Sequence, residues 1–329
     1  MSGPIIDSPA AKQLFTRAAG LDGAGGNERL KRIVGRITTD LCRTVEEFDV
    51  TPTEFWAAVG YLTRLGQANE AGLLVAGLGI EHFLDLLMDE KESQAGLEGG
   101  TPRTIEGPLW LADAPLEKGE ARLDQDPEQG TALFMEGQVK DADGTPVPGA
   151  VVDVWHANTR GGYSHFDPSQ SPYNLRRRIE TDGGGRYRFR SVLPSGYGCP
   201  PDGPTQELLD HLGRHGRRPA HIHFFVEAPG CRRLTTQINI AGDQYLHDDF
   251  AFATRDGLIP EIVRHDDPAE IARRGLSEPF VSIRFDFALN RILLLPICTA
   301  SPAAWPSPTC EARSWTCRRY VGTSCPTPR

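Results

Sequence analysis

The chain of 329 residues lacks an excess of basic side chains, because its 44 Asp and Glu outnumber its 35 Lys and Arg and give a formal net charge of −9. Proteins that bind extended nucleic acids neutralise phosphates with Lys and Arg, so this balance argues against a nucleic-acid partner. Long apolar runs are also missing: the most apolar stretch, LLVAGLGI at residues 73–80, is far shorter than the ~20 residues of a membrane-spanning helix. The first residues, MSGPIIDSPAAKQ, have neither the basic nor the apolar segment of a signal peptide. We therefore expect a cytoplasmic protein without a membrane span.

Cysteine is scarce over most of the sequence. Cys42, Cys199 and Cys231 are scattered through the first 291 residues, as free thiols in a reducing compartment are. The last 32 residues hold four more cysteines, but no C-x₂-C pair, which argues against a structural zinc site. Residues 292–329 hold six prolines and have no helical or strand period, and we predict that they form a disordered tail. Its cysteines are Cys298, Cys310, Cys317 and Cys325.

The first hundred residues have the patterns of helices. Proline follows a polar residue at Ser8-Pro9 and at Thr51-Pro52, as at the first position of a capped helix, and Glu54 completes a capping box. Between these two starts, apolar residues recur at helical spacing. Such helices bury one face on another domain or on a partner subunit. We predict helices over residues 7–19, 27–45, 51–65 (with a stop at Gly66) and 80–92.

From Thr101 onward, short strand-like runs alternate with glycine and proline turns. Asp143-Gly144 and Asp182-Gly183 are typical of hairpin turns. No segment with the length and period of a helix separates the central runs, which favours an antiparallel β-sandwich over a parallel sheet. We therefore predict a mostly β protein with a helical N-terminal part. Its expected domains are residues 1–100, residues 101–291 and the tail at 292–329.

Two histidines stand inside one of these runs, RRPAHIHFF at residues 217–225. Residues two apart in a strand point to the same face, so His221 and His223 present both rings to one spot. A pair of metal ligands has this arrangement, but so have two polar rings on a solvated sheet face. The H-x-H pattern alone does not decide between them.

Two tyrosines upstream of this strand are set among glycines. Tyr163 follows Gly161 and Gly162, and Tyr197 lies between Gly196 and Gly198. Glycine relieves backbone crowding, so a turn can aim a large side chain at a fixed point. Each tyrosine could equally pack on the rim of a sheet with its hydroxyl in water. The combination of both tyrosines with an H-x-H strand is rarer than any of its parts.

The chemistry of these side chains gives the combination a meaning. A phenolate is a hard anionic donor that suits Fe(III), and imidazole suits iron as well as zinc or copper. Tyrosine has an ordinary pKa near 10, so only a strong Lewis acid removes its proton at neutral pH. Two phenolates and one hydroxide balance the three charges of ferric iron, and a neutral centre is buried without a large desolvation penalty. With the same ligands, zinc would be one charge short of this balance.

The chain resembles the intradiol catechol 1,2-dioxygenase family from about residue 10 to residue 290. The resemblance rests on the segments TPRTIEGPLW, VDVWHANTRGGYSHFDPSQS, LPSGYGCPPDGPTQELLDHLGRHGRRPAHIHFF, LTTQINIAGD and DDFAFATRDGL. It implies a mixed-topology β-sandwich preceded by a helical linker domain that forms a homodimer interface. It also implies one Fe(III) per subunit, no organic cofactor and a phospholipid bound in a channel at that interface. The implied iron ligands are Tyr163, Tyr197, His221 and His223.

The implied reaction inserts both atoms of O₂ into catechol, between its two hydroxyl-bearing carbons, to give cis,cis-muconate. In the family, the tyrosine that matches Tyr197 leaves the metal when the substrate binds and takes up one of its protons. Arg218 is implied to stabilise negative charge on the ring, and Gln237 to point its amide into the site. Spacing alone does not choose between Arg218 and its neighbours Arg214 and Arg217.

The resemblance further implies an apolar pocket, as an unsubstituted aromatic ring requires. No implied lining residue is placed to pair with a substrate carboxylate, which argues against protocatechuate. Ala76 is smaller than the proline of some relatives, and Trp110 replaces a common tyrosine, so tolerance of methyl- or chlorocatechol stays open. The implied lining residues are Leu73, Ala76, Ile105, Pro108, Leu109, Arg218, Phe250 and Ala251.

Two alternatives compete with a catechol 1,2-dioxygenase. One is a related ring-cleaving enzyme that prefers hydroxyquinol or chlorocatechol. The other is a non-catalytic sandwich whose helical part binds lipid or a partner, which gives no reason for Arg218, Gln237 and two glycine-set tyrosines beside an H-x-H strand. After residues 285–292 (FDFALNRI) the sequence departs from the family, as an altered reading frame would make it do. We expect the other histidines to be structural or solvated: His82, His156, His165, His211, His215, His247 and His265.

Overall fold

A computed structural model of the chain describes residues 4–97, 99–126 and 130–292. These residues divide into two compact units, residues 4–64 and residues 65–292. The cysteine-rich tail that we predict to be disordered lies outside the described residues. All residues of the predicted site fall in the second unit.

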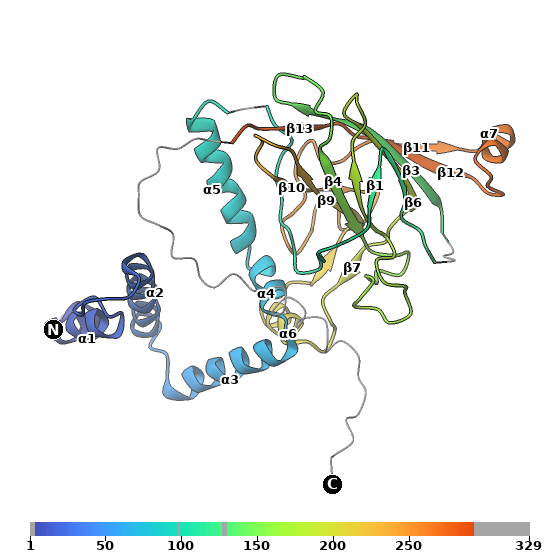
Figure 1. The fold of residues 1–329 in the computed structure, drawn as a ribbon. Helices are drawn as coiled ribbons and strands as arrows, with labels where there is room; N and C mark the ends of the chain where they lie inside the picture. The colour runs from blue at the N-terminus through green and yellow to red at the C-terminus, as the bar shows by residue number, and fades with distance from the viewer. Residues whose placement is uncertain (1–3, 98, 127–129, 293–329) are drawn as a thin grey trace, which may run out of the picture. The chain divides into compact units, whose positions relative to one another are not determined.

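The first unit is helical, as its sequence predicts (Figure 1). The predicted caps are present. Ser8 Oγ accepts a hydrogen bond from the backbone N–H of Ala11. The backbone N–H of Thr51 donates to the carboxylate of Glu54, and the backbone N–H of Glu54 donates to Oγ1 of Thr51. The helical elements are η1 (Ile5–Asp7), α1 (Pro9–Ala18), α2 (Glu28–Glu47) and most of α3 (Pro52–Ala68).

Helix α3 does not stop at Gly66, where we predicted its end, but continues to Ala68. A single glycine inside a helix costs only about 1 kcal/mol relative to alanine, which the rest of the helix tolerates. The chain turns at Asn69, whose φ of 62° lies in the left-handed region. Asparagine enters this region more readily than most residues.

Two further helices, α4 (Ala71–Gly77) and α5 (Ile80–Gln94), open the second unit. The period of the sequence predicted α5 but not α4, which is short and lies in the apolar, glycine-containing stretch. No described helix is by itself long and apolar enough to cross a membrane, although α4 and α5 together, bent by 60° at their junction, meet that criterion.

The rest of the second unit is a sandwich of two mixed sheets. Four strand pairs are parallel: β1 with β5, β2 with β6, and β12 and β13 with β3. The predicted antiparallel or mixed sandwich is thus confirmed, and its sheets are of the mixed kind. One sheet has the order β1 (Leu116–Lys118), β5 (Arg176–Glu180), β4 (Val151–His156), β9 (His221–Glu227), β10 (Leu234–Asn239). The other has the order β11 (Ile262–His265), β12 (Phe280–Arg284), β3 (Ala132–Asp141), β6 (Arg186–Val192), β2 (Glu120–Arg122), with β13 (Phe287–Leu289) also on β3.

Smaller elements complete this unit. A two-stranded pair, β7 (Tyr197–Gly198) and β8 (Arg217–Arg218), lies beside the sandwich. The helices α6 (Pro204–His211) and α7 (Pro268–Arg273) lie in connections between strands. Neither helix was predicted, because each is too short to show a clear helical period.

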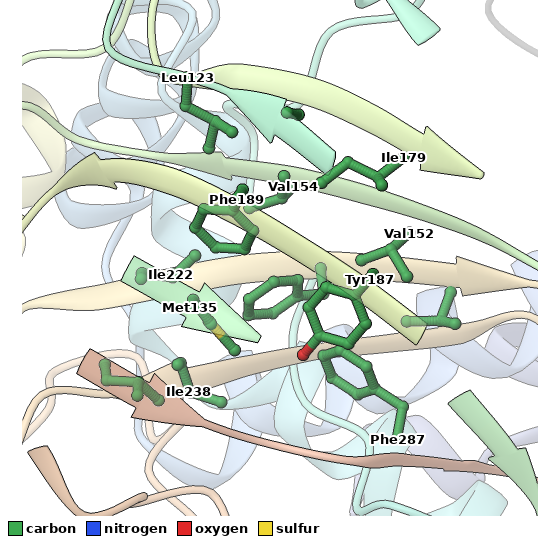
Figure 2. Packing of buried hydrophobic residues seen from close by; sticks show 14 of the residues in the cluster. Leu123, Met135, Val152, Val154, Ile179, Tyr187, Phe189, Ile222, Ile238 and Phe287 are labelled. Carbon is green, nitrogen blue, oxygen red and sulfur yellow. The ribbon is translucent and has the colours of Figure 1, made fainter. Parts of the chain in front are cut away.

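The core lies between the two sheets and is formed by the inward side chains of each strand. Figure 2 shows Val152 and Ile222 from one sheet packed with Met135, Phe189 and Tyr187 from the other. Along β6, buried residues alternate with exposed arginines, as expected for a strand with one face in the core. Burying one large apolar side chain contributes roughly 1.5–3 kcal/mol, so this core makes a rigid platform for the site at its edge.

One of the two predicted hairpin turns differs from expectation. Asp143-Gly144 closes a hairpin in which the backbone N–H of Val147 donates to the carbonyl of Val139 over 2.9 Å. Asp182-Gly183 also forms a turn, with the carboxylate of Asp182 accepting the backbone N–H of Gly184. Its flanking strands, β5 and β6, however, belong to opposite sheets, so the hairpin prediction is wrong there. An aspartate closes a turn in this way whether or not the strands on either side pair with each other.

Candidate metal and substrate site

The two histidines of strand β9 lie on its buried face. His221 and His223 are each only 1% exposed, and their Nε2 atoms are 3.1 Å apart. Trp155 of β4 stacks on the His223 ring with a centroid distance of 5.0 Å. The pair is therefore not a solvated sheet face but a closed site.

The two glycine-set tyrosines contact each other, and Tyr197 contacts His221. The centre of the Tyr163 ring lies 5.4 Å from the centre of the Tyr197 ring, and the centre of the Tyr197 ring lies 5.4 Å from that of His221. Tyr163 is 3% exposed, and its hydroxyl has no hydrogen-bond partner within the described residues. The structure thus brings together the four side chains that the resemblance implies as metal ligands.

Two glycines make this approach possible. Gly161 has a φ of 83°, and a Cβ atom at this position would lie 2.9 Å from Cβ of Tyr197. At Gly196, a Cβ atom would lie 2.5 Å from the backbone carbonyl oxygen of Arg218. Any side chain at either position would therefore push the tyrosine turns away from the histidine strand.

The histidines are held in the form that binds a metal. Burial, followed by the charge of Arg218, lowers the pKa of His221 to about 3. Burial lowers the pKa of His223 well below its usual range. The Nδ1 atom of His221 lies 2.6 Å from the carbonyl oxygen of Pro219, which fixes Nδ1 as the protonated nitrogen and leaves the lone pair on Nε2. Both rings are neutral donors at neutral pH.

The residues present fit a hard trivalent cation. Burial, and then the neighbouring Tyr197, raise the pKa of Tyr163 well above 10, so a strong positive charge is needed to form its phenolate. The unpartnered Tyr163 hydroxyl and the facing nitrogens of His221 and His223 provide donors for such a charge. Within the described ranges, no group of three or more His, Cys, Asp or Glu could hold a metal, so a site here requires the tyrosines.

The structure distinguishes the three clustered arginines. Arg218 pairs with Tyr197 between β8 and β7, and its guanidinium Nη1 lies 3.1 Å from Nε2 of His221 and 3.4 Å from the Tyr197 hydroxyl. Arg214 instead donates to backbone carbonyls outside the ligand set, and Arg217 is exposed. Only Arg218 of the three thus faces the ligands.

Gln237 also faces the site, because it lies opposite His223 in the pairing of β10 with β9. Its Oε1 accepts a hydrogen bond from Nη2 of Arg218 over 2.8 Å, and its Nε2 donates to Oδ1 of Asn239 over 2.8 Å. The carboxylate of Asp249 accepts hydrogen bonds from Nη2 and Nε of the same guanidinium. The sequence analysis missed Asn239 and Asp249, which have no motif of their own.

The predicted pocket residues gather beside the ligands from three parts of the chain. Ala76 of α4, Ile105, Phe250 and Ala251 belong to one buried apolar cluster. Leu109 packs on a second cluster, which contains Tyr163. The apolar character of the pocket follows directly from these residues.

Helix α4 contributes a further part of this wall. Leu73 is half-buried on α4, three residues before Ala76. Pro108 lies against Gly72, where a Cβ atom would be 3.1 Å from the proline ring. Pro108 therefore packs against the turn of α4 that carries Leu73.

The loop that carries Ile105, Pro108 and Leu109 is anchored at both ends. Glu81 of α5 accepts the backbone N–H groups of Glu106 and Gly107 over 2.8 and 3.2 Å. The indole of Trp110 donates to Asp153 over 3.0 Å, and burial raises the pKa of that carboxyl group to about 6.

The remaining histidines take no part in the ligand set. His156 is the most buried of them, and its ring bonds the Ser191 hydroxyl and the carbonyl of Ala157, both over 2.7 Å. Burial lowers its pKa to about 4, so it stays neutral. It has the structural role that we expected.

Comparisons with known proteins agree with this geometry. A family described as "Dioxygenase" matches residues 105–291, and one described as "Catechol dioxygenase N terminus" matches residues 27–96. The chain is 51% identical over 297 residues to catechol 1,2-dioxygenase of Acinetobacter baylyi, covering 89% of this chain and 95% of the relative. It is 63% identical over 237 residues to catechol 1,2-dioxygenase 2 of Acinetobacter lwoffii, covering 72% and 86%.

The chain belongs to the intradiol catechol 1,2-dioxygenase family. The crystal structure of catechol 1,2-dioxygenase from Pseudomonas arvilla C-1 is similar with a TM-score of 0.85 and 58% identity, covering 88% of this chain and 94% of that one. Hydroxyquinol 1,2-dioxygenase of a Rhizobium species is more distant, at 33% identity over 296 residues, covering 88% of this chain and 97% of the relative. Intradiol dioxygenases are generally iron enzymes, which agrees with the donor set of Tyr and His.

Proposed function

We propose that this chain cleaves catechol with O₂ between the two hydroxyl-bearing carbons and releases cis,cis-muconate. The observation that carries the proposal is the meeting of two tyrosines and two neutral, buried histidines beside a buried arginine. It occurs in a chain that is 51% and 63% identical to two catechol 1,2-dioxygenases.

The proposed metal is a single ferric ion per subunit, held by Tyr163, Tyr197, His221 and His223, without an organic cofactor. When bound, it supplies a Lewis acid that draws electron density from the diol and makes a ring carbon reactive toward O₂. Zinc or another divalent ion does not match two phenolates as well in charge.

We assign the two tyrosines different roles, because their surroundings differ. Tyr163 is buried and packs against the ring of Tyr197, so we assign it to a lasting ligand. Tyr197 is half-buried, and its hydroxyl lies 3.4 Å from the Arg218 guanidinium. We assign to Tyr197 the uptake of a substrate proton, for which its oxygen must be free to move away from the ligand cluster.

Arg218 stabilises the negative charge that develops on the substrate ring. Its guanidinium is fixed by hydrogen bonds and shielded from water, and a fixed charge in such a place acts more strongly than one in solvent. Gln237 orients it from the other side.

The pocket favours an unsubstituted diol over a carboxylated one. Its lining is apolar apart from Arg218, and the charge of Arg218 is already matched by Asp249. A substrate carboxylate would therefore be desolvated without a partner. The catechol-cleaving relatives cited above are also more similar to this chain than the hydroxyquinol-cleaving one is.

We further propose the domain arrangement of the family: a linker and dimerisation domain at residues 1–100 and a catalytic domain at residues 101–291. Exposed apolar side chains on α2 and α5, among them Leu41, Phe83 and Leu84, support a homodimer with bound phospholipid. Among the described residues, Cys42, Cys199 and Cys231 form no disulfide with one another, which supports the proposed reducing compartment.

The direct test of the proposed function is turnover by the purified protein. Catechol, 4-methylcatechol, 4-chlorocatechol and hydroxyquinol are compared by the rise of the absorbance band of each muconate product. We expect the highest kcat/KM for catechol. A higher value for hydroxyquinol or chlorocatechol would favour the related ring-cleaving enzyme, and no turnover of any diol would favour the non-catalytic sandwich.

A further inference from the structure

Asp249 holds the catalytic arginine with both of its oxygens. Oδ1 accepts from Nε of Arg218 over 3.2 Å, and Oδ2 accepts from Nη2 over 3.1 Å. The side chains of the pair are only 1% and 4% exposed. A two-point bond between a planar carboxylate and a planar guanidinium fixes direction as well as distance.

The same carboxylate shapes the pocket wall. It accepts the backbone N–H of Ala251 over 3.0 Å and of Ala253 over 3.3 Å. Between them, Phe252 has a φ of 56°, so the chain bends around the carboxylate. The turn presents Phe250 and Ala251 to the pocket, and one side chain thus anchors both the arginine and a substrate-contacting wall.

The guanidinium of Arg218 has competing acceptors at the ligand cluster. Its Nη1 already lies within hydrogen-bond distance of His221 Nε2 and of the Tyr197 hydroxyl. Asp249 draws Nε and Nη2 to the opposite side, and Gln237 accepts a further bond from Nη2. Without the carboxylate, the cation would be free to turn fully toward the ligands and away from the substrate ring.

We propose that Asp249 is a positioning residue for catalysis, which fixes the Arg218 guanidinium against the substrate and keeps its Nε and Nη2 atoms from turning toward the ligands. The inference rests on the proposed function, because it assigns Asp249 a task in the same site. The competing explanation is that Asp249 only closes the turn at residues 250–253.

A double-mutant cycle separates these explanations. Asp249→Asn keeps the shape and one acceptor oxygen for the backbone but loses the charge that fixes Arg218. We expect kcat for catechol to fall about 10- to 100-fold, the range associated with misplacing a catalytic group by about 1 Å. The dissociation constant of catechol, measured without O₂ by the visible spectrum of the iron-loaded protein, should change less than about threefold, because the pocket wall remains.

The cycle is completed in an Arg218→Met background. If Asp249 acts through Arg218, adding Asp249→Asn to Arg218→Met lowers kcat no further than about twofold. If the two losses multiply instead, Asp249 acts through the turn and the proposal is overturned. An unchanged kcat in Asp249→Asn alone overturns it as well.

Stability provides a readout that does not depend on activity. Arg218→Met leaves a buried carboxylate without its cation, and Asp249→Asn leaves a buried cation without its anion, so each lowers Tm. The double variant has neither unpaired charge, and we expect its Tm to exceed that of Arg218→Met. Should Asp249→Asn alone fail to fold, the comparison of the double variant with Arg218→Met still decides: equal kcat supports the proposal, and a further loss contradicts it.

Asp182→Asn is the matched control. Asp182 accepts two backbone N–H groups, of Gly184 and Arg186, both over 2.8 Å, in an exposed turn away from the site. This variant should keep the kcat of the unaltered chain. If the unaltered chain itself does not cleave catechol, the proposed function fails. If the unaltered chain is active and Asp249→Asn has the same kcat, only this inference fails.

Discussion

Tyr163 and Tyr197 have the same side chain but different surroundings, and the difference assigns their roles. The guanidinium of Arg176 lies 5.6 Å from the centre of the buried Tyr163 ring, and its charge partly offsets the effect of burial on the tyrosine pKa. Tyr197 is half-buried beside Arg218. In the proposed site, the buried Tyr163 is the lasting ligand and the half-buried Tyr197 is the releasable one.

Replacing Tyr163 by Phe should abolish iron retention. The variant loses one of the two anionic oxygens that match the charge of the metal, and we expect both the iron content per chain and kcat to fall at least tenfold. Metal analysis and steady-state kinetics measure the two effects. The control is Tyr187→Phe, which removes a core hydroxyl bonded to the carbonyl of Phe285 over 2.8 Å and should cost only about 1 kcal/mol of stability. Full iron content in Tyr163→Phe would remove this residue from the ligand set.

Ala76 should control the tolerance of substituted diols. It is buried in the cluster with Ile105 and Phe250, so Ala76→Val narrows the pocket by two methyl groups. We expect the ratio of kcat/KM for 4-chlorocatechol to that for catechol to fall about 10-fold or more, as one misfitted group costs roughly 1–3 kcal/mol. Competition between the two substrates measures the ratio directly. An unchanged ratio of the two kcat/KM values would show that the ring substituent does not lie against residue 76.

The site could be predicted from the sequence only where residues carry a local signal. The H-x-H pair and the glycines around both tyrosines are such signals, and the resemblance linked them. Spacing could not choose Arg218 among three neighbours, because the choice depends on its pairing with Tyr197 across β7 and β8; only the resemblance implied it. Asp249 lies 31 residues from its partner and looks like an ordinary turn aspartate. Contacts of this range appear only when the chain is folded.

At the scale of elements, α5 lies beside the sandwich (Figure 1) and is fixed to the second unit by acidic side chains. Asp89 bonds Arg103 and Arg255, both over 2.7 Å, and Glu92 bonds Arg103 and Arg232. The residues are spaced so that they lie on one side of the helix. Glu81, at the start of the same helix, accepts hydrogen bonds from the loop that carries Ile105 and Pro108. The ion pairs of α5 therefore also help to fix the position of this loop.

Asp85 lies in this helix between Glu81 and Asp89, and it should make stability depend on pH. Burial, and then the charge of Glu81, raise its pKa from 3.8 to about 6. The folded state thus binds a proton more tightly than the unfolded state, so this group destabilises the fold above pH 6 and has no such effect below pH 4. Two pKa units correspond to about 3 kcal/mol, and partial hydration reduces this to about 1–2 kcal/mol.

Asp85→Asn should therefore raise the free energy of unfolding at pH 8 by about 1–2 kcal/mol. The gain should shrink as the pH falls from 7 to 4. Urea unfolding of both proteins across this range measures the difference. A gain that is the same at pH 4 and pH 8 would contradict a buried, titrating carboxylate.

Helix α5 was predicted because fifteen residues are long enough to show a period, whereas α4 and α6, with seven and eight residues, are not. The resemblance implied mixed sheets, but the strand pattern did not show which strand pairs are parallel, for a different reason. Which strands become neighbours depends on how the two sheets pack, and the alternation of side chains along one strand does not contain that information.

For the molecule as a whole, the account predicts a homodimer. Apolar side chains such as Ile37, Leu41 and Phe83 are 54%, 62% and 61% exposed, and a water-exposed surface of this kind is stabilised by a partner. Light scattering after gel filtration should give a mass of about 72 kDa, twice the chain mass of 36.1 kDa. A mass of one chain at micromolar concentration would contradict the predicted role of the helices.

The central claim is that a ferric centre with two tyrosine ligands lets O₂ attack the diol between its oxygen-bearing carbons. The most direct measurement is mass spectrometry of the product formed from catechol under ¹⁸O₂ by protein whose iron content has been determined. The account predicts cis,cis-muconate with both labelled atoms, formed in proportion to the iron present. An aldehyde product from cleavage beside the diol carbons, or full activity in protein that holds only a divalent metal, would contradict it.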